Sequence, residues 1–259
     1  VGDEVMGGDG LPHKVIGVYP QGKKDVYEVT FSDGRKTRCC KEHLWSVTTR
    51  TRRNHGRGYT TMSLDEMLKA PIKGSKGFTY RVPLCKPVEY QPSAPLPVSP
   101  YLLGALMGDG CLTLTRNQSN RGRTLYFNNS EHDIIGRVTN ELNRIGAKMR
   151  FNPSTANQFA ISNCDGLKDS IVALGLNVKS KMRFIPEIYK RAAIADRRLL
   201  LAGLIDTDGS VSEGGAISYS TQSEQLACDV RELAHGLGYR AASSVDRRGG
   251  VGKGRLRKM

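Results

Sequence analysis

Two stretches of the chain carry apolar side chains on every side of a helical turn. Residues 102–110 read LLGALMGDG and residues 201–209 read LAGLIDTDG, and they match at their first, third, eighth and ninth positions. A helix that is apolar all round lies in a protein core. We therefore predict two buried helices, and their likeness predicts two copies of one structural unit in a single chain.

Small residues recur four positions apart in both stretches. Gly104 and Gly108 form this pair in the first stretch, and Gly203 and Thr207 form it in the second. Residues four apart share a helix face, so each predicted helix has a flat stripe that permits close packing against the other. We expect the glycine that ends each stretch to take the left-handed conformation that often terminates a helix.

The pattern after each stretch predicts strands and helices in the same order. Strands are expected at residues 111–116 and 124–129, a helix follows Ser130, strands follow at 148–152 and 158–162, and a helix spans 166–174. After the second stretch the pattern predicts two strands, a helix capped by Ser223 and a strand from Tyr239, with the chain ending inside a fourth strand. The predicted fold class is α+β with two αββαββα halves (101–198 and 199–259), the second truncated.

The amino-terminal part has a different pattern. Short segments at 15–19, 26–31, 36–40, 44–47 and 78–84 predict strands, and Ser63 is expected to cap one short helix over 64–69. Residues 85–100 contain five prolines, which predicts a stiff linker. We expect three parts, namely a mostly-β module (1–86), a proline-rich linker (87–100) and the domain of the paired helices (101–259).

Asp109 and Asp208 stand at the carboxyl ends of the two apolar stretches. The helix macrodipole makes this end negative, so a carboxylate is unfavourable there. Parallel pairing of the helices would bring both carboxylates together, and a divalent cation such as Mg²⁺ would relieve the repulsion. The alternative is that these are ordinary Asp-Gly turns, since the pair occurs five times in the chain.

The paired stretches resemble the signature of LAGLIDADG (DOD-type) homing endonucleases. The second copy departs from that signature at Thr207, and the first has Met107 in place of the earlier acid. The resemblance implies that Asp109 and Asp208 bind a catalytic Mg²⁺ or Mn²⁺. It also implies that the carbonyls before them, those of Gly108 and Thr207, face the metal.

Residues 179–186 (KSKMRFIP) resemble the family's lysine-rich stretch before an Ile-Pro pair. Members of the family often place a basic residue near the scissile phosphate. Lys181 is the catalytic candidate that this implies, and Lys179 is the alternative. A solvated lysine on a loop is the other reading.

The amino-terminal module resembles part of the splicing (Hint) domain of inteins, in particular inteins of phage-like ATPases and helicases. VGDEVMGGDG at residues 1–10 resembles the strand after the first loop of that domain, and GRKTRCCKEHLWSV at 34–47 resembles the block that carries its splicing histidine. The histidine maps to His43. An intein's first nucleophile and its final His-Asn pair are absent from residues 1–259, so we expect this chain alone not to splice, and His43 is otherwise one ring of a β module.

Charge and composition narrow the choice of partner and compartment. Lys and Arg outnumber Asp and Glu by 39 to 25, a net charge of +14 that favours a polyanion. A basic ribosomal or membrane-surface protein is the alternative. The sequence has no apolar run long enough for a transmembrane helix, no signal-peptide core and no CxxC pair. We therefore expect an intracellular protein with reduced thiols.

The polar faces of the predicted strands suit double-stranded DNA. Side chains of these types contact bases and phosphates, and a two-stranded ribbon fits the major groove. The alternative is an ordinary solvent face of an antiparallel sheet. Residues 50–58 (RTRRNHGRG) are likewise either a phosphate contact or a solvated loop. The candidate DNA-binding residues are Thr113, Thr115, Arg116, Arg121, Arg123, Tyr126, Asn128, Ser218, Ser220, Gln222, Arg247 and Arg248.

Together these features predict a site-specific, metal-dependent double-strand DNA endonuclease. The target is expected to be long and partly palindromic, and the protein a monomer with internal pseudo-twofold symmetry. Two alternatives stay open. The chain is otherwise a non-cleaving DNA-binding relic, or part of a protein-splicing element that needs residues beyond both ends.

Overall fold

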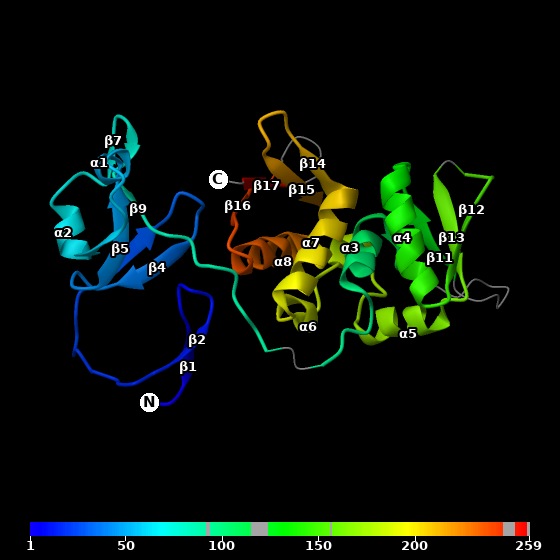
Figure 1. Ribbon diagram of the computed structural model, residues 1–259, viewed down its shortest axis with the longest axis horizontal. Coiled ribbons are helices and arrows are strands. Elements are labelled where there is room, and N and C mark those ends of the chain that lie inside the picture. The colour runs from blue at the N-terminus through cyan, green and yellow to red at the C-terminus, as the bar shows by residue number, and fades with distance from the viewer. Residues whose placement is uncertain (92–93, 115–123, 156, 246–251, 258–259) are drawn as a thin grey trace. The chain divides into compact units, whose positions relative to one another are not determined.

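A computed structural model describes residues 1–91, 94–114, 124–155, 157–245 and 252–257. The chain divides into two compact units, an amino-terminal unit of residues 1–85 and a carboxy-terminal unit of residues 86–259 (Figure 1). No helix in these described ranges has the length and apolar character needed to cross a membrane.

The amino-terminal unit consists mainly of short antiparallel strands. Its pairs are β1 (Glu4–Met6) with β2 (Pro12–Lys14), β3 (Tyr27–Thr30) with β4 (Lys36–Cys39), and β7 (Lys73–Gly74) with β8 (Gly77–Phe78). The longest strand, β5 (Leu44–Thr49), pairs with both β6 (Thr60–Ser63) and β9 (Tyr80–Arg81). The helices are α1 (Arg50–Asn54) and α2 (Leu64–Leu68).

Local sequence signals predict the structure of this unit only in part. The Ser63 cap is confirmed: its hydroxyl accepts from Glu66 N at 3.2 Å, and the Glu66 carboxylate accepts from Ser63 N at 2.7 Å. The strand predicted at 15–19 is wrong, because pairing with β1 ends at residue 14. The basic stretch predicted as a loop begins with α1, whose first turn is capped by the Thr49 hydroxyl.

The carboxy-terminal unit repeats one order of elements. The first run is α3 (Pro100–Asp109), β10 (Gly110–Cys111), β11 (Leu125–Asn128), α4 (His132–Arg144), β12 (Lys148–Phe151), β13 (Gln158–Ser162) and α5 (Asp165–Ala173). A connection with the 3-10 turn η1 (Ser180–Met182) and α6 (Glu187–Lys190) follows. The second run is α7 (Ile194–Asp208), β14 (Gly209–Val211), β15 (Ile217–Thr221), α8 (Glu224–Gly236), β16 (Arg240–Ser243) and β17 (Gly252–Arg257).

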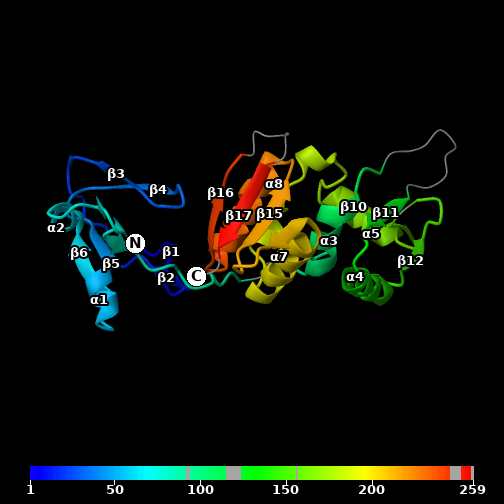
Figure 2. The same cartoon turned by 90° about the horizontal axis from the view of Figure 1, so that it is seen from above.

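Each run forms one four-stranded antiparallel sheet. The first sheet has the order β10-β11-β13-β12 and the second sheet the order β14-β15-β17-β16, so corresponding strands occupy corresponding places. Both views show α3 and α7, the motif helices, side by side between the sheets (Figures 1 and 2). The predicted repetition of elements is therefore observed.

The motif helices approach each other through glycines, as the small-residue stripe predicts. A Cβ on Gly104 would collide with the Leu200 carbonyl oxygen, and a Cβ on Gly203 would collide with the Tyr101 carbonyl oxygen. Backbone thus packs directly on backbone at this crossing. Leu103 and Leu204 are fully buried beside it.

The glycines that end the motif helices are required for a different reason from the one predicted. Gly110 has φ −84° and ψ 144°, and Gly209 has φ −96° and ψ 167°, so both are extended and not left-handed. A Cβ on Gly110 would collide with the Leu106 carbonyl, and one on Gly209 with the Ile205 carbonyl. The chain turns so tightly from helix into strand that only glycine fits.

An ionic contact joins the two runs beside the helix crossing. The Asp206 carboxylate on α7 accepts from the Tyr101 hydroxyl at 2.9 Å and from Arg137 Nη1 at 2.7 Å. The Arg137 guanidinium lies over the Tyr101 ring, 3.9 Å from its centroid. Residues of α3, α4 and α7 are thereby fixed to one another.

The proline-rich stretch is bound to the carboxy-terminal unit. Val88 N donates to the Gly236 carbonyl at 2.8 Å, and the buried Arg197 guanidinium donates to the carbonyls of Val88 and Gly236. The Tyr189 hydroxyl donates to the Val98 carbonyl at 2.7 Å. The described parts of the stretch predicted as a spacer therefore lie along α6, α7 and α8.

Gly203→Ala is expected to lower the free energy of unfolding by about 2 kcal/mol, because the added methyl must push two backbones apart. Gly136→Ala is the matched control, since Gly136 is exposed on α4 with open space around its Cα. There, alanine should stabilise the helix by up to about 1 kcal/mol. Urea denaturation measures both, and equal effects of the two substitutions would contradict the close helix approach.

Candidate functional site

The carboxyl ends of the motif helices bring Asp109 and Asp208 together. Each is the last helical residue before the glycine that starts an edge strand. The ends are in contact, since a Cβ on Gly108 would collide with the Thr207 side chain and lie 3.4 Å from Asp208 Oδ2. The convergence expected from the paired stretches is thus present.

Burial raises the pKa of both carboxyl groups. For Asp208 burial comes first and the neighbouring Asp109 charge second, and together they raise its pKa to about 6. Burial also raises the pKa of Asp109, but a hydrogen bond from Asn129 opposes that rise. The ionised form of both acids is therefore disfavoured, and that of Asp208 more strongly.

Two asparagines at the end of β11 serve Asp109. Asn129 Nδ2 donates to Asp109 Oδ2 at 2.6 Å, and Asn128 Nδ2 donates to the Asp109 carbonyl at 3.4 Å. Asn128 was predicted to contact DNA, whereas Asn129 was not predicted for any role. Asn129 stands one residue beyond β11, the strand whose central residues pair with the strand that follows Asp109.

Arg183 is a cationic residue that contacts the end of α3 beside the two aspartates. Its guanidinium donates to the carbonyl of Met107, to that of Gly108 at 3.1 Å, and to that of Gly110 at 2.6 Å. It thereby caps the carboxyl end of α3, and its charge opposes the rise in pKa of both aspartates. Burial lowers the pKa of Arg183 itself, and the Asp208 charge opposes that shift.

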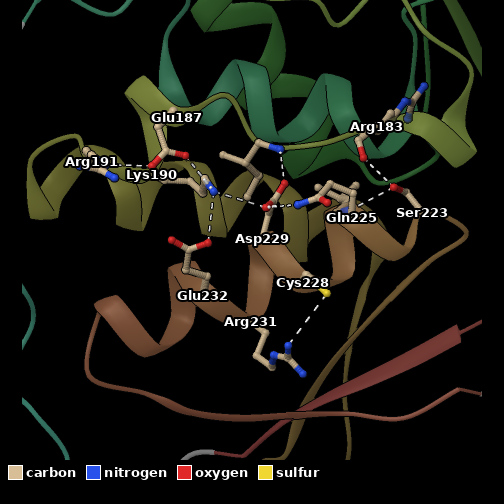
Figure 3. A network of polar contacts seen from close by, with 12 residues as sticks. Arg183, Glu187, Lys190, Arg191, Ser223, Gln225, Cys228, Asp229, Arg231 and Glu232 are labelled. Atoms are coloured by element: carbon tan, nitrogen blue, oxygen red, sulfur yellow. Dashed lines mark hydrogen bonds and ion pairs between the residues drawn. The ribbon is translucent and has the colours of Figure 1, made fainter. Parts of the chain in front are cut away.

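The backbone that follows the Arg183 side chain is held by α8 and by its N-cap residue (Figure 3). The Ser223 hydroxyl, which also caps α8, donates to the Arg183 carbonyl at 2.6 Å. The buried Asp229 carboxylate accepts from Ile185 N at 2.8 Å and from Gln225 Nε2 at 2.9 Å, with Lys190 Nζ at 3.5 Å. A helix of the second run therefore positions the residue that caps the motif helix of the first.

Lys181, the predicted basic residue, lies two positions from Arg183. It is exposed on η1, and Lys179 precedes that turn. The sequence prediction favoured the lysines of KSKMRFIP and missed its arginine. The residue type was itself an indication, because a guanidinium offers several donors in a fixed fork and suits a cluster of carbonyls at a helix end.

The carbonyls assigned to metal lie at the same helix ends. The Gly108 carbonyl accepts a bond from Arg183, which leaves it a second lone pair. The Thr207 hydroxyl donates back to the Gly203 carbonyl at 2.9 Å. No three His, Cys, Asp or Glu side chains gather as a ligand set within the described ranges. A metal here would rest on two carboxylates, backbone carbonyls and water, the oxygen donors that Mg²⁺ accepts.

Several candidate DNA contacts lie on the strands next to the site. Tyr126 and Asn128 alternate with the buried Leu125 and Phe127 on β11. Ser218 and Ser220 flank the buried Tyr219 on β15, and Ser218 shares a 2.7 Å hydrogen bond with Ser210. Gln222 is exposed just beyond that strand.

Other candidates are placed elsewhere or are not described. The Thr113 hydroxyl donates to the Val178 carbonyl at 3.3 Å, in a segment that follows the two-residue β10. His43 is exposed in the amino-terminal unit, with its ring 5.3 Å from that of Trp45. The candidates outside the described residues are Thr115, Arg116, Arg121, Arg123, Arg247 and Arg248.

The chain is similar over most of its length to one bacterial protein. It is 30% identical over 265 residues to the replicative DNA helicase DnaB of Mycobacterium intracellulare, which covers 95% of this chain and 40% of the helicase. A shorter stretch of 143 residues is 27% identical to a DNA gyrase protein of Mycobacterium gordonae, covering 51% of this chain and 24% of the gyrase protein. The chain thus spans less than half the length of either relative.

Two solved structures show a likeness at low identity. The homing endonuclease I-DmoI in complex with DNA and Mn is 16% identical with a TM-score of 0.47, over 62% of this chain and 89% of that chain. Full-length DUF199/WhiA from Thermatoga maritima is 13% identical with a TM-score of 0.43, over 64% of this chain and 52% of that chain.

A family model matches the part of the chain that contains Asp208. Residues 195–256 match the model of the LAGLIDADG-like domain. The match begins in α7 and runs through the second sheet into β17. Over these residues the chain is therefore similar to a LAGLIDADG-like domain.

Proposed function

We propose that the chain is a site-specific endonuclease of double-stranded DNA, of the LAGLIDADG homing type. The observation that carries this proposal is the pair of half-buried aspartates at the touching ends of the motif helices. Two carboxylates that repel each other in a partly desolvated place oppose stability, and such placement is typical of functional sites.

The residues present fit a divalent metal ion. Asp109 and Asp208 would hold Mg²⁺ or Mn²⁺, with the carbonyls of Gly108 and Thr207 as further proposed donors. When bound, such an ion supplies activation of water and stabilisation of the leaving oxygen in phosphodiester hydrolysis. Asn129 orients the Asp109 carboxylate, and Arg183 fixes the end of α3 and lowers the cost of ionising both acids.

The proposed partner is DNA with a long, partly palindromic target. Two sheets of the same strand order, each with polar side chains beside one aspartate, support contacts to two half-sites by one chain. In this proposal the two runs are related by a pseudo-twofold axis and the protein acts as a monomer. The net charge of +14 favours the approach to phosphates.

We also propose that the chain comes from an intein. The helicase and gyrase relatives are much longer proteins, which suits an element inserted in a host protein. In this proposal the amino-terminal unit is part of a Hint domain and His43 its splicing histidine. Two alternative functions remain candidates. The chain would then be a non-cleaving DNA-binding relic, or it would be part of a splicing element.

Asp109→Asn together with Asp208→Asn is expected to slow DNA cleavage at least about 100-fold, because an amide binds a hard cation far less well than a carboxylate. The assay uses DNA that spans an uninterrupted insertion site, with Mg²⁺ or Mn²⁺. Asp196→Asn is the matched control, since Asp196 lies in the first turn of the same helix as Asp208, and it should keep cutting. Retained cleavage by the double variant would exclude the proposed site, and wild-type binding without cutting in any metal would favour the relic.

Without metal, stability is expected to fall as the pH rises from about 4 to about 6. The pKa of Asp208 is about 6 in the folded chain and near 4 in an unfolded one. The folded state therefore binds this proton more tightly, so the free energy of unfolding falls between pH 4 and pH 6 and stays at the lower value above pH 6. Asp208→Asn should gain about 1–2 kcal/mol at pH 8, discounted for partial exposure, and nothing at pH 4.

Urea denaturation in a chelator measures this pH dependence. The matched control is Asp169→Asn, an exposed position on α5, which should change the free energy of unfolding by less than about 0.5 kcal/mol. A gain that is equal at pH 4 and pH 8 would contradict the assigned origin.

Lys181→Ala and Arg183→Lys test two different roles. Lys181 is the proposed basic group at the scissile phosphate, and Arg183 is the residue that caps the end of α3. Lys181 is exposed, so its alanine variant should keep the wild-type melting temperature while cleavage slows about 10-fold to 100-fold. Arg183→Lys loses the forked contact to three carbonyls, so it should lower the free energy of unfolding by about 2 kcal/mol. Unchanged cleavage by Lys181→Ala would remove Lys181 from the proposed site.

A further inference from the structure

Two buried polar atoms at the site have no hydrogen-bond partner. They are the Tyr219 hydroxyl and Arg183 Nε, and in the described part of the carboxy-terminal unit they are the buried side-chain polar atoms in this condition. Tyr219 is only 3% exposed. Buried polar groups in native proteins are hydrogen-bonded, to protein or to ordered water, so these two atoms call for a partner.

The fold places Tyr219 next to the second aspartate. On β15 it pairs with Gly209, the residue after Asp208. Burial raises the pKa of Tyr219, and the nearby Asp208 charge raises it further. The Thr221 hydroxyl, two residues along the same strand face, is also near, but it accepts from Ser223 N at 3.2 Å and its geometry gives no hydrogen bond with Tyr219.

The first sheet has different residues at the positions that correspond to Tyr219 and Thr221. Phe127 pairs with Gly110, the residue after Asp109, and so corresponds to Tyr219 but has no hydroxyl. Asn129, two residues further on, corresponds to Thr221 and donates directly to Asp109 at 2.6 Å. A threonine side chain is shorter than that of asparagine, and the Thr221 hydroxyl already accepts from Ser223 N, so Thr221 gives Asp208 no direct donor of this kind among the described residues.

We propose that the Tyr219 hydroxyl and Arg183 Nε hold an ordered water molecule beside Asp208. Both atoms offer a proton, and a water molecule enclosed by several polar groups can satisfy them and donate to the carboxylate. Tyr219 is then a positioning residue of the second aspartate, and it does through water what Asn129 does directly for Asp109. The catalytic part of this inference rests on the proposed endonuclease function.

A consequence for DNA is unequal cleavage of the two strands. Each aspartate serves mainly one strand in the proposed function, so loss of the Tyr219 hydroxyl affects the strand served by Asp208. Tyr219→Phe is a mild change, since phenylalanine already occupies the corresponding buried place as Phe127. The variant is therefore expected to fold as the wild type does.

The first test needs no activity. A crystal structure of the metal-free protein should show a water molecule within hydrogen-bond distance of the Tyr219 hydroxyl and Arg183 Nε, and Tyr219→Phe should lose it. The inference is overturned if no water molecule lies between these two groups and Asp208, or if the Tyr219 hydroxyl binds a protein atom instead.

The second test follows each strand of a doubly labelled target DNA. Tyr219→Phe should slow the cleavage of one strand about tenfold, leave the other within about twofold and accumulate a nicked product. Adding Thr221→Asn should restore the affected strand, because the amide then donates directly to Asp208. Tyr239→Phe, which removes a more exposed hydroxyl from the same half, is the matched control and should change neither strand.

The outcomes of the two tests separate the inference from the function. Equal slowing of both strands, or of neither, overturns the role of Tyr219 while the endonuclease stands. A wild-type protein that cuts neither strand overturns the proposed function, and the crystal structure still decides the water site.

Discussion

The close approach of α3 and α7 is the constraint on which the carboxy-terminal unit depends. Gly104 and Gly203 let backbone meet backbone, so the two helices run to a common end. Each sheet starts directly from that end through a glycine, and each therefore has a fixed place relative to the crossing. A larger side chain at either crossing glycine would move both sheets and both aspartates at once.

This approach creates an electrostatic conflict that the surrounding residues only partly relieve. Asp109 and Asp208 add negative charge where two helix dipoles already converge. Arg183 donates hydrogen bonds to the carbonyls at the end of α3, and Asn129 donates one to the Asp109 carboxylate. The pKa of Asp208 nevertheless stays raised, at about 6. A fold optimised for stability alone would not retain this arrangement, and the cation of the proposed function would relieve it.

The sequence predicts the repeated and local features of this protein well. The apolar stretches, their small-residue stripe and the order of the following strands and helices all depend on patterns within a few residues, and the structure has them. The Ser63 and Ser223 caps are of the same kind. The conformation of Gly110 and Gly209 was missed because it depends on how tightly the chain turns, which no local pattern records.

The site was predictable only in its symmetric part. Asp109 and Asp208 follow from the repeat itself, whereas Asn129 and Arg183 follow from contacts across 20 and 75 residues of chain. Arg183 shows the difficulty best, because its side chain reaches back to α3 while its backbone is held from α8. Spacing in the sequence gives no sign of either contact.

The position of Arg183 also bears on how the two runs relate as folding units. It belongs to the connection between them, yet one run supplies the carbonyls that it binds and the other supplies the hydroxyl that orients it. Neither run alone would contain a complete set of these partners. The connecting segment is therefore hydrogen-bonded to both runs, so a substitution at Ser223 in the second run is expected to alter how Arg183 meets the end of α3 in the first.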